Sequence, residues 1–146
     1  ENIVDVVNSS IDYLKKRTSK KINYIISPSA PEIIVPLNRH LFEWVIENLC
    51  KNAIDAMSGS GTIELTIFED DKFVYVDVQD TGKGIHKSKF KAIFNPGYTS
   101  KKSGWGLGLS LSKRIVENYH SGRIFVKSSS LGKGTLFRIQ LKKARK

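Results

Sequence analysis

The sequence has little of several features that assign small proteins to familiar classes. It holds one cysteine, Cys50, so it contains no disulfide framework and fits a reducing compartment. Cys50 falls within an apolar helical pattern, where we expect a small core residue. No apolar run approaches the roughly 18 residues that span a bilayer, and we expect no signal peptide. What is left is the ordinary composition of a globular domain, with 40% hydrophobic and 26% charged residues.

Three common nucleotide-binding signatures are also absent. There is no G-x-x-x-x-G-K-[ST] loop and no HRD or DFG motif of the protein kinases. The stretch GWGLGL (104–109) is not a dinucleotide fingerprint, because Leu109 stands where that motif needs glycine. A nucleotide site in this chain therefore requires a different set of motifs.

The positive charge does not by itself identify a partner. The net charge is +10, and cationic residues gather at 15–21, in the central loop and at 142–146. None of these runs interleaves with aromatic residues, so we expect no nucleic-acid partner. A solvated surface, or one that faces a phosphorylated ligand or an acidic partner domain, explains the charge as well.

The hydrophobic periodicity predicts an α+β domain. Steps of three and four residues predict helices over 3–14, from an Asn38 cap to about 57, and from about 109 to 119, the last closed by Ser121 and Gly122. Short apolar or alternating runs predict strands at 22–27, 32–35, 62–69, 72–80, 123–129 and 135–141. We predict one domain over 1–146, a two-layer α/β sandwich whose mixed, mostly antiparallel sheet carries about three helices on one face. Because the chain starts inside a helical pattern, we expect it to be a piece of a longer protein.

The segment ENLCKNAIDAM (47–57) combines an apolar and a polar helix face. Asn48, Asn52 and Asp55 share the polar face. Neutral amide oxygens suit a hydrated Mg²⁺ that relies on substrate phosphates, although both amides could instead bond to neighbouring loops. The expected buried residues are Val45, Ile46, Leu49, Ala53, Ala56 and Met57.

Two glycine clusters follow this helix. In DTGKGI (80–85), Asp80 ends a hydrophobic strand, and a buried carboxylate needs donors such as the amine of adenine. Gly82 and Gly84 would let a base approach the backbone, although turns of this composition are common. In GWGLGLSLS (104–112), a glycine-rich turn leads into a helix start, which can bind phosphate. Thr99, Ser100, Lys101 and Lys102 lie just upstream, where a flexible loop with solvated lysines is the alternative.

Together, these segments resemble the Bergerat-fold ATP-binding domain shared by sensor histidine kinases, gyrase-type topoisomerases, mismatch-repair ATPases and heat-shock chaperone ATPases. ENLCKNAIDAM resembles the N box, DTGKGI the G1 box, FNPGYTSKK (94–102) the F box and lid, and GWGLGLSL the G2 box. SLGKGTLFRIQL (130–141) resembles the closing strand, so the resemblance covers nearly the whole chain.

The resemblance implies a set of site residues. Asn52 would hold Mg²⁺, Asn48 would support the phosphates, and Asp80 would bind adenine. Phe94 and Tyr98 would position a lid over 86–103 that is mobile until nucleotide orders it. The expected catalytic residues are Asn48, Asn52 and Lys101, and the expected ATP-binding residues are Asn52, Asp55, Ala56, Asp80, Gly82, Gly84, Ile85, Tyr98, Thr99, Ser100, Lys101, Gly106, Leu107, Gly108, Leu109 and Thr135.

One missing carboxylate indicates the branch. ATP-hydrolysing members carry a glutamate four residues before the metal-binding asparagine, and this chain has Asn48 there. Glu47 is about 100° further round the helix. We therefore predict the catalytic domain of a two-component sensor histidine kinase, a transferase that uses ATP and Mg²⁺. The alternatives are a serine kinase of the anti-sigma type, an ATP-hydrolysing clamp domain, and a binding module without catalysis.

The resemblance also implies partners. None of His40, His86 and His120 lies in the setting of a phosphoacceptor, so the acceptor histidine is expected on a separate dimerisation domain that this chain lacks. A response regulator would be the indirect partner. We expect this domain to be monomeric when isolated and to lie in the cytoplasm, and the parent protein could be anchored in the inner membrane.

Overall fold

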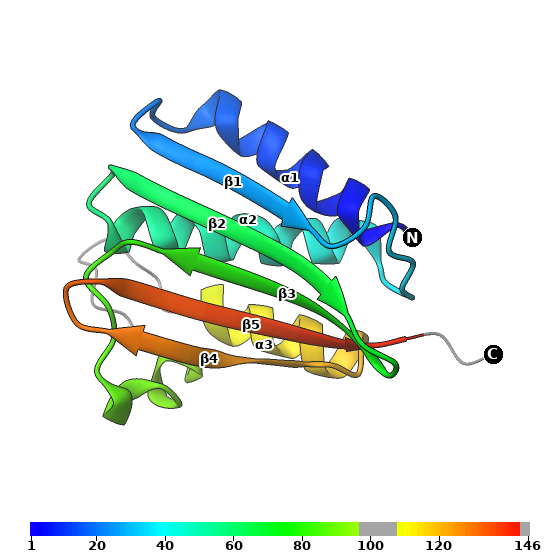
Figure 1. Ribbon diagram of the computed structural model, residues 1–146. Coiled ribbons are helices and arrows are strands. Elements are labelled where there is room, and N and C mark those ends of the chain that lie inside the picture. Colours follow the sequence, from blue (N-terminus) through cyan, green and yellow to red (C-terminus); the bar gives the residue numbers. More distant parts are fainter. Residues whose placement is uncertain (97–107, 144–146) are drawn as a thin grey trace.

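The computed structural model describes residues 1–96 and 108–143, and in these residues helices pack on one face of a five-stranded sheet (Figure 1). This arrangement confirms the predicted α+β sandwich. Two short 3-10 turns, η1 and η2, and a π-helical turn, η3, complete the chain. The elements are α1 (Ile3–Arg17), β1 (Ile22–Pro28), α2 (Arg39–Ala56), β2 (Gly61–Glu69), β3 (Phe73–Asp80), η1 (Lys87–Lys89), η2 (Ala92–Phe94), α3 (Gly108–Arg114), η3 (Ile115–Tyr119), β4 (Arg123–Ser130) and β5 (Gly134–Lys142).

The sheet is mixed and mostly antiparallel. Its strand order is β1-β2-β3-β5-β4, and only β1 and β2 run parallel. A parallel pair needs a crossover connection, and α2 supplies it. In this way α2 crosses the helical face of the sheet and ends beside the last residues of β3.

The prediction of a strand at 32–35 was wrong. Ile34 forms only an isolated bridge with Asn2, because prolines at 31 and 36 flank the segment and limit its pairing. Its backbone instead holds the start of α1: Ile33 donates to Oδ1 of Asn2 at 3.0 Å and accepts from the amide of Ile3 at 2.9 Å. The segment is therefore part of a helix cap.

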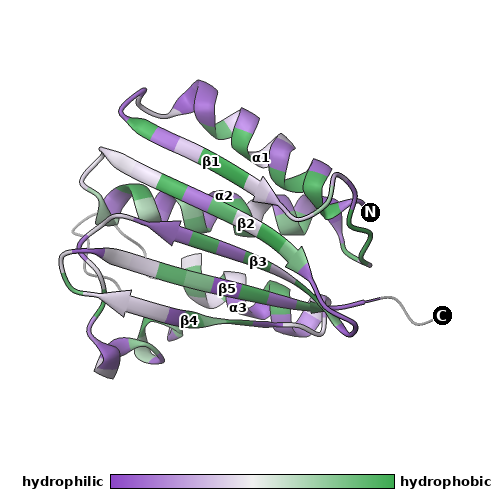
Figure 2. Cartoon of the chain, in the orientation of Figure 1, coloured by the Kyte–Doolittle hydropathy of each residue, from purple (hydrophilic) through white to green (hydrophobic). Residues whose placement is uncertain are grey.

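Both long helices begin at an asparagine. Oδ1 of Asn2 accepts from the amide of Val4, and Oδ1 of Asn38 accepts from the amide of Leu41 at 3.0 Å. Such caps satisfy amides that have no partner inside the helix. Each helix then turns an apolar stripe toward the sheet, and the strands alternate in hydropathy (Figure 2). None of the described helices has the length and apolarity of a membrane span.

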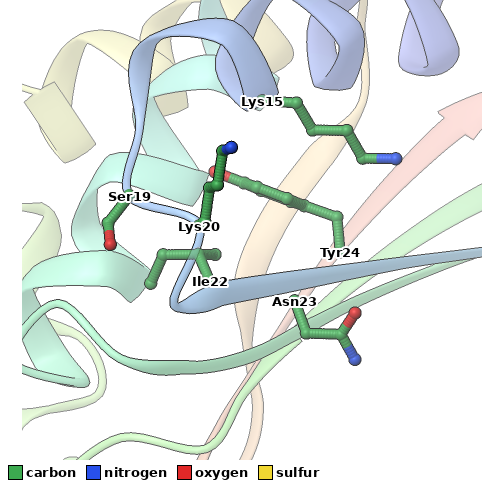
Figure 3. A pocket seen from close by; sticks show the side chains of 6 residues that line it. All are labelled: Lys15, Ser19, Lys20, Ile22, Asn23 and Tyr24. Carbon is green, nitrogen blue, oxygen red and sulfur yellow. The ribbon is translucent and has the colours of Figure 1, made fainter.

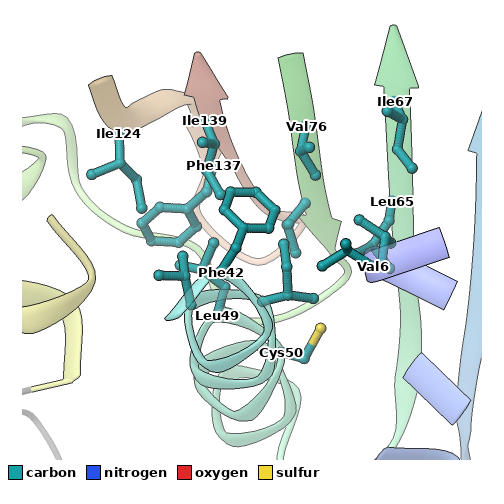
Figure 4. Packing of buried hydrophobic residues seen from close by; sticks show 14 of the residues in the cluster. Val6, Phe42, Leu49, Cys50, Leu65, Ile67, Val76, Ile124, Phe137 and Ile139 are labelled. Atoms are coloured by element: carbon teal, nitrogen blue, oxygen red, sulfur yellow. The ribbon is translucent and has the colours of Figure 1, made fainter. Parts of the chain in front are cut away.

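The core lies between α2 and the sheet. Phe42, Leu49 and Cys50 point from α2 toward the strand residues Phe137 and Val76 (Figure 4). Cys50 is completely buried, as predicted, and burial raises the pKa of its thiol to about 12, so it is an unreactive core residue. Ala56 is only partly buried, in contrast to the prediction, because it lies at the last turn of α2.

A histidine joins the start of α2 to the end of η3. Nε2 of His120 accepts from the amide of Asn38 at 2.9 Å, and Nδ1 donates to the carbonyl of Ile115 at 2.9 Å. These two partners require the neutral ring with its proton on Nδ1. The ring also meets Phe42 edge-on at 6.0 Å. After it, Ser121 takes the left-handed conformation (φ 52°) that ends the helical segment.

Candidate functional site

The carboxyl group of Asp80 is the most buried acidic group at the candidate site. Asp80 ends β3 and is 5% exposed. Oδ1 accepts from the amide of Gly82 at 2.9 Å and from that of Thr135 at 3.2 Å. Burial raises the pKa of this carboxyl group, and the two backbone bonds partly oppose the rise. Both of these backbone bonds are on Oδ1.

Thr135, through its backbone amide and its hydroxyl group, connects Asp80 to Ser129 and so to the second half of the turn. The hydroxyl groups of Thr135 and Ser129 lie 2.8 Å apart, and Ser129 accepts from the amide of Ile85 at 2.7 Å. Ser129 also donates to the carbonyl of Gly134 at 3.0 Å. The β4–β5 turn thus holds both ends of the segment 80–85. Sequence patterns missed Ser129, which lies in a run of three serines that nothing local distinguishes.

Gly82 lets the segment after Asp80 touch the end of α2. A Cβ on Gly82 would lie 2.7 Å from the backbone carbonyl of Ala56, which is too close for any side chain. In the same contact, the amide of Lys83 donates to the carbonyl of Ala56 at 2.9 Å. Glycine is required here because two backbones meet, and the contact fixes α2 relative to Asp80.

The polar face of α2 contacts the start of α3. Nδ2 of Asn48 donates to the hydroxyl of Ser112 at 2.9 Å, and that hydroxyl donates to the carbonyl of Gly108 at 2.8 Å. A Cβ on Gly108 would lie 2.5 Å from Oδ1 of Asn48. The side-chain amide of Asn48 therefore positions Gly108 at the start of α3. For Asn48 the structure thus matches the alternative given above, in which the asparagine side chain bonds to a neighbouring segment. Ser112 is a second residue that sequence reasoning missed.

Asn52 and Asp55 lie further along the same helix, toward Asp80. Asn52 is half-buried and Asp55 is exposed. The described residues contain no group of three His, Cys, Asp or Glu side chains that could hold a metal ion. The oxygen of Asn52 suits a cation that takes most of its remaining ligands from phosphates and water.

Phe94 packs into the core at the end of the segment that follows Ile85. It is 7% exposed and meets Phe137 of β5 edge-on at 6.1 Å. Nζ of Lys113 lies 5.9 Å from the centre of its ring, so Phe94 also touches α3. Gly108 and Leu109 begin α3. The remaining predicted site residues, Tyr98, Thr99, Ser100, Lys101, Gly106 and Leu107, lie outside the described residues, as does most of the predicted lid.

The fold brings together the predicted residues that it describes. Asp80, Gly82 and Thr135 are joined by hydrogen bonds or backbone contact, and Ala56 connects them to α2. Asn48 and Gly108 meet about two turns earlier on α2. The arrangement offers a carboxylate oxygen and a helix start, which together suit a base and its phosphates.

Known proteins resemble the chain in sequence and structure. The family model described as histidine kinase-, DNA gyrase B- and HSP90-like ATPase matches residues 38–145. Sporulation kinase A of Bacillus subtilis is 42% identical over 99 residues, which is 68% of this chain and 16% of that protein. Sensor histidine kinase ZraS of Escherichia coli K12 is 34% identical over 139 residues, 93% of this chain and 29% of that protein.

A solved structure has the same fold over almost the whole chain. The catalytic domain of histidine kinase ThkA is 27% identical with a TM-score of 0.88, and the match covers 98% of this chain and 93% of that domain. ThkA has also been solved in complex with response regulator protein TrrA. The chain thus spans less than a third of the length of the two curated relatives and nearly all of an isolated catalytic domain.

Proposed function

The chain belongs to the histidine kinase-, DNA gyrase B- and HSP90-like ATPase family, and from this membership we propose that it binds Mg-ATP and donates the γ-phosphoryl group to a histidine on a separate domain. Its relatives are sensor histidine kinases, and it corresponds to their catalytic ATPase part. The predicted family is confirmed, whereas the site residues and the transfer reaction are our proposal.

The observation that carries the proposal is the buried carboxyl group of Asp80. Its Oδ1 is held by two backbone amides. An exocyclic amine of adenine would donate to Oδ2, and the close contact of Gly82 with Ala56 would fix the position of this carboxyl group relative to α2. A donor from a ligand to Oδ2 would add a hydrogen bond to a carboxyl group that is already largely removed from solvent, so the arrangement favours a ligand that supplies one.

The phosphates would extend from Asp80 toward Asn52 and the start of α3. In our proposal Asn52 holds Mg²⁺ through its amide oxygen, and the metal neutralises phosphate charge. Asn48 acts mainly through Ser112, by holding Gly108 and Leu109 where their backbone amides meet phosphate. We also propose that Tyr98, Thr99, Ser100, Lys101, Gly106 and Leu107, which lie outside the described residues, bind the nucleotide.

The surroundings of Asn48 favour a kinase over a clamp ATPase. A clamp ATPase needs a water-activating carboxylate at this position, and Asn48 instead donates to Ser112. Burial raises the pKa of the neighbouring Glu47, while the charges of Lys51 and Arg17 lower it. Glu47 is one residue earlier on α2, about 100° from Asn48 around the helix axis, so it does not take the place of the missing carboxylate. Without a base for water, ATP is kept for the acceptor.

We also propose the wider setting. Residues 1–146 would be a single catalytic domain in the cytoplasm, working with the dimerisation and phosphoacceptor domain of its parent kinase and, through it, with a response regulator. The ThkA complex with TrrA and the sensor kinases among the relatives support this setting. The serine-kinase alternative would transfer to a hydroxyl group instead.

Calorimetric titration with a non-hydrolysable ATP analogue, with and without Mg²⁺, tests the proposal. We expect a Kd of about 1–100 μM that tightens with Mg²⁺. An Asn52→Ala variant should lose the effect of Mg²⁺ while keeping most of the metal-free affinity. If the folded, unmutated chain does not bind the ATP analogue, the kinase proposal is wrong and the non-catalytic binding module becomes the favoured alternative. Mixing the domain with acceptor domains that present histidine or serine then separates the two kinase classes.

A further inference from the structure

A depression of about 260 Å³ lies between the end of α1 and the start of β1, away from the residues assigned to ATP. Figure 3 shows Lys15 and Lys20 above the ring of Tyr24, with Asn23 on the neighbouring strand position. Ser19 and Ile22 complete the lining, which contains no acidic side chain. The depression is therefore a positively charged hollow with a partly apolar floor.

The floor of the hollow is held in place. The hydroxyl of Thr18 donates to the carbonyl of Leu14 at 2.8 Å, so the hydroxyl of Tyr24, 2.9 Å away, donates to Thr18. Tyr24 is only 9% exposed, and burial raises the pKa of its hydroxyl group, which keeps this donor protonated. A ligand would thus meet a preformed surface.

The two lysines that line the hollow have no close acidic partner among the described residues, although the charge of Arg17 acts on Glu47. Five of the seven residues from 15 to 21 are lysine or arginine. Charges in the last turn of α1 stabilise the helix dipole, but Lys20 and Lys21 lie beyond that turn. Helix stability therefore explains only part of the cluster.

The hollow opens onto an edge of the sheet. β1 pairs with β2 on one side and is the first strand in the sheet order, so within the described residues its other edge has no strand partner. The strand itself carries no charge there: Asn23 is exposed and Ile25 is 41% exposed. Charged side chains on the strand would discourage pairing, whereas here the lysines gather at one end of an uncharged edge.

We propose that the hollow and the adjoining edge of β1 bind an acidic, extended segment of a partner protein. Strand addition would supply main-chain hydrogen bonds, and a carboxylate of the segment would enter the hollow between Lys15 and Lys20. A flat anionic membrane or a nucleic acid would meet the lysines without using the apolar floor or the strand edge. This interaction goes beyond ATP binding and does not depend on it.

Fluorescence anisotropy with a labelled peptide of alternating valine and glutamate tests this proposal. We expect saturable binding, with amide shifts in the NMR spectrum confined to residues 15–27. The double variant Lys15→Glu/Lys20→Glu should bind about tenfold or more weakly, which is about 1.4 kcal/mol. The matched control Lys127→Glu/Lys133→Glu, at exposed positions of β4 and the β4–β5 turn, changes the net charge equally and should bind as the parent does.

The same experiment has clear contrary outcomes. Equal weakening in both double variants would show general charge attraction and overturn the proposal. Absence of saturation up to about 1 mM peptide, or unchanged binding of a peptide with N-methylated backbone, would also overturn it. Vesicles of phosphatidylglycerol or a single-stranded oligonucleotide that bind more tightly than the peptide, through Lys15 and Lys20, would assign the cluster to a different partner.

Discussion

Asp80 keeps a carboxyl group 5% exposed at the end of the central strand β3. Burial disfavours its charged form and raises its pKa, although Gly82 and Thr135 donate to it. A raised pKa in the folded state means that the group stabilises the fold fully only below the pH at which it titrates in the unfolded chain. This stabilisation is lost as the pH rises through the folded-state pKa, so at neutral pH the ionised group costs stability.

Replacement of Asp80 by asparagine should therefore separate stability from binding. Asp80→Asn keeps an oxygen for both backbone amides and removes the buried charge, so the midpoint of urea unfolding at pH 7 should rise. The difference from the parent should shrink toward pH 4. Affinity for the ATP analogue should fall at least about tenfold, because an amide nitrogen would face the amine of adenine.

Urea unfolding across pH and calorimetry on the same preparations check both halves of this prediction. A variant that is less stable at pH 7 would contradict the assigned cost of the buried charge. A variant that binds the analogue as tightly as the parent would contradict the adenine assignment instead. The two failures are distinguishable because urea unfolding measures the unliganded protein, whereas calorimetry measures binding of the ATP analogue.

Ser10 offers a second test of a buried polar group. It is 1% exposed in α1, and its hydroxyl has no hydrogen-bond partner among the described residues. Ser10→Ala should raise the free energy of unfolding by about 1–2 kcal/mol, since it removes a polar group without a partner and improves helix propensity. The control is Ser9→Ala at the neighbouring exposed position, where only the change in helix propensity should alter the free energy of unfolding. Equal midpoints of urea unfolding for the two variants would show that Ser10 has a partner.

Local patterns predicted most elements of the fold. The alternation in 62–69 and 72–80 gave the β2–β3 hairpin, and Asn38 gave the start of α2, because turn residues and caps act within a few positions. The segment 32–35 looked like a strand by the same criterion, yet its partner is the cap of α1. The parallel pairing of β1 with β2 and the π-helical end of α3 depend on packing between distant segments, which periodicity does not encode.

The same division applies to the candidate site. Asp80 and Gly82 could be found from the sequence because the carboxylate and the glycine needed for close approach are neighbours in the chain. Ser112 and Ser129 could not, because their function comes from contacts with Asn48 and Ile85. No local sequence pattern around either serine predicts a contact with a residue that is distant in the chain.

His120 connects two elements that carry the candidate site. It bonds to Asn38 at the start of α2 and to Ile115 in η3, which continues α3. His120→Ala leaves both backbone groups without this partner and opens space beside Phe42, so the free energy of unfolding should fall by about 2–3 kcal/mol. The control is His40→Ala, whose side chain is 96% exposed and whose loss should cost less than about 0.5 kcal/mol.

Urea unfolding of the two histidine variants measures this difference. Nuclear magnetic resonance should show amide shifts at Asn38 and Ile115 in the His120 variant only. If both variants lose the same small amount of stability, the bridge does not join α2 to η3 as the geometry indicates.

Across the molecule, the candidate site lies at one end of the sandwich and the His120 bridge at the other. Asp80, Gly82 and the end of α2 meet at the first end, while Asn38 and His120 meet where α2 begins. The basic loop between α1 and β1 lies at the first end too, because the amide of Gly61 donates to the carbonyl of Lys21 at 3.2 Å. Nucleotide and an acidic partner would therefore approach the same end by different surfaces.

This layout predicts that the isolated chain does not phosphorylate its own histidines. His40 is twelve residues before Asn52 on α2, about 18 Å along the axis, and both nitrogens of His120 have partners. His86 is nearer, directly after Ile85, but its Nδ1 lies 2.8 Å from the hydroxyl of Ser88 and accepts from the amide of Ser88 at 3.2 Å. With ATP labelled in the γ-phosphate, we expect no acid-labile label on the chain alone. Label should appear on a separately supplied acceptor domain, and Asp80→Asn should greatly reduce it. Label on the chain alone that disappears in His86→Ala would instead place the acceptor within this domain.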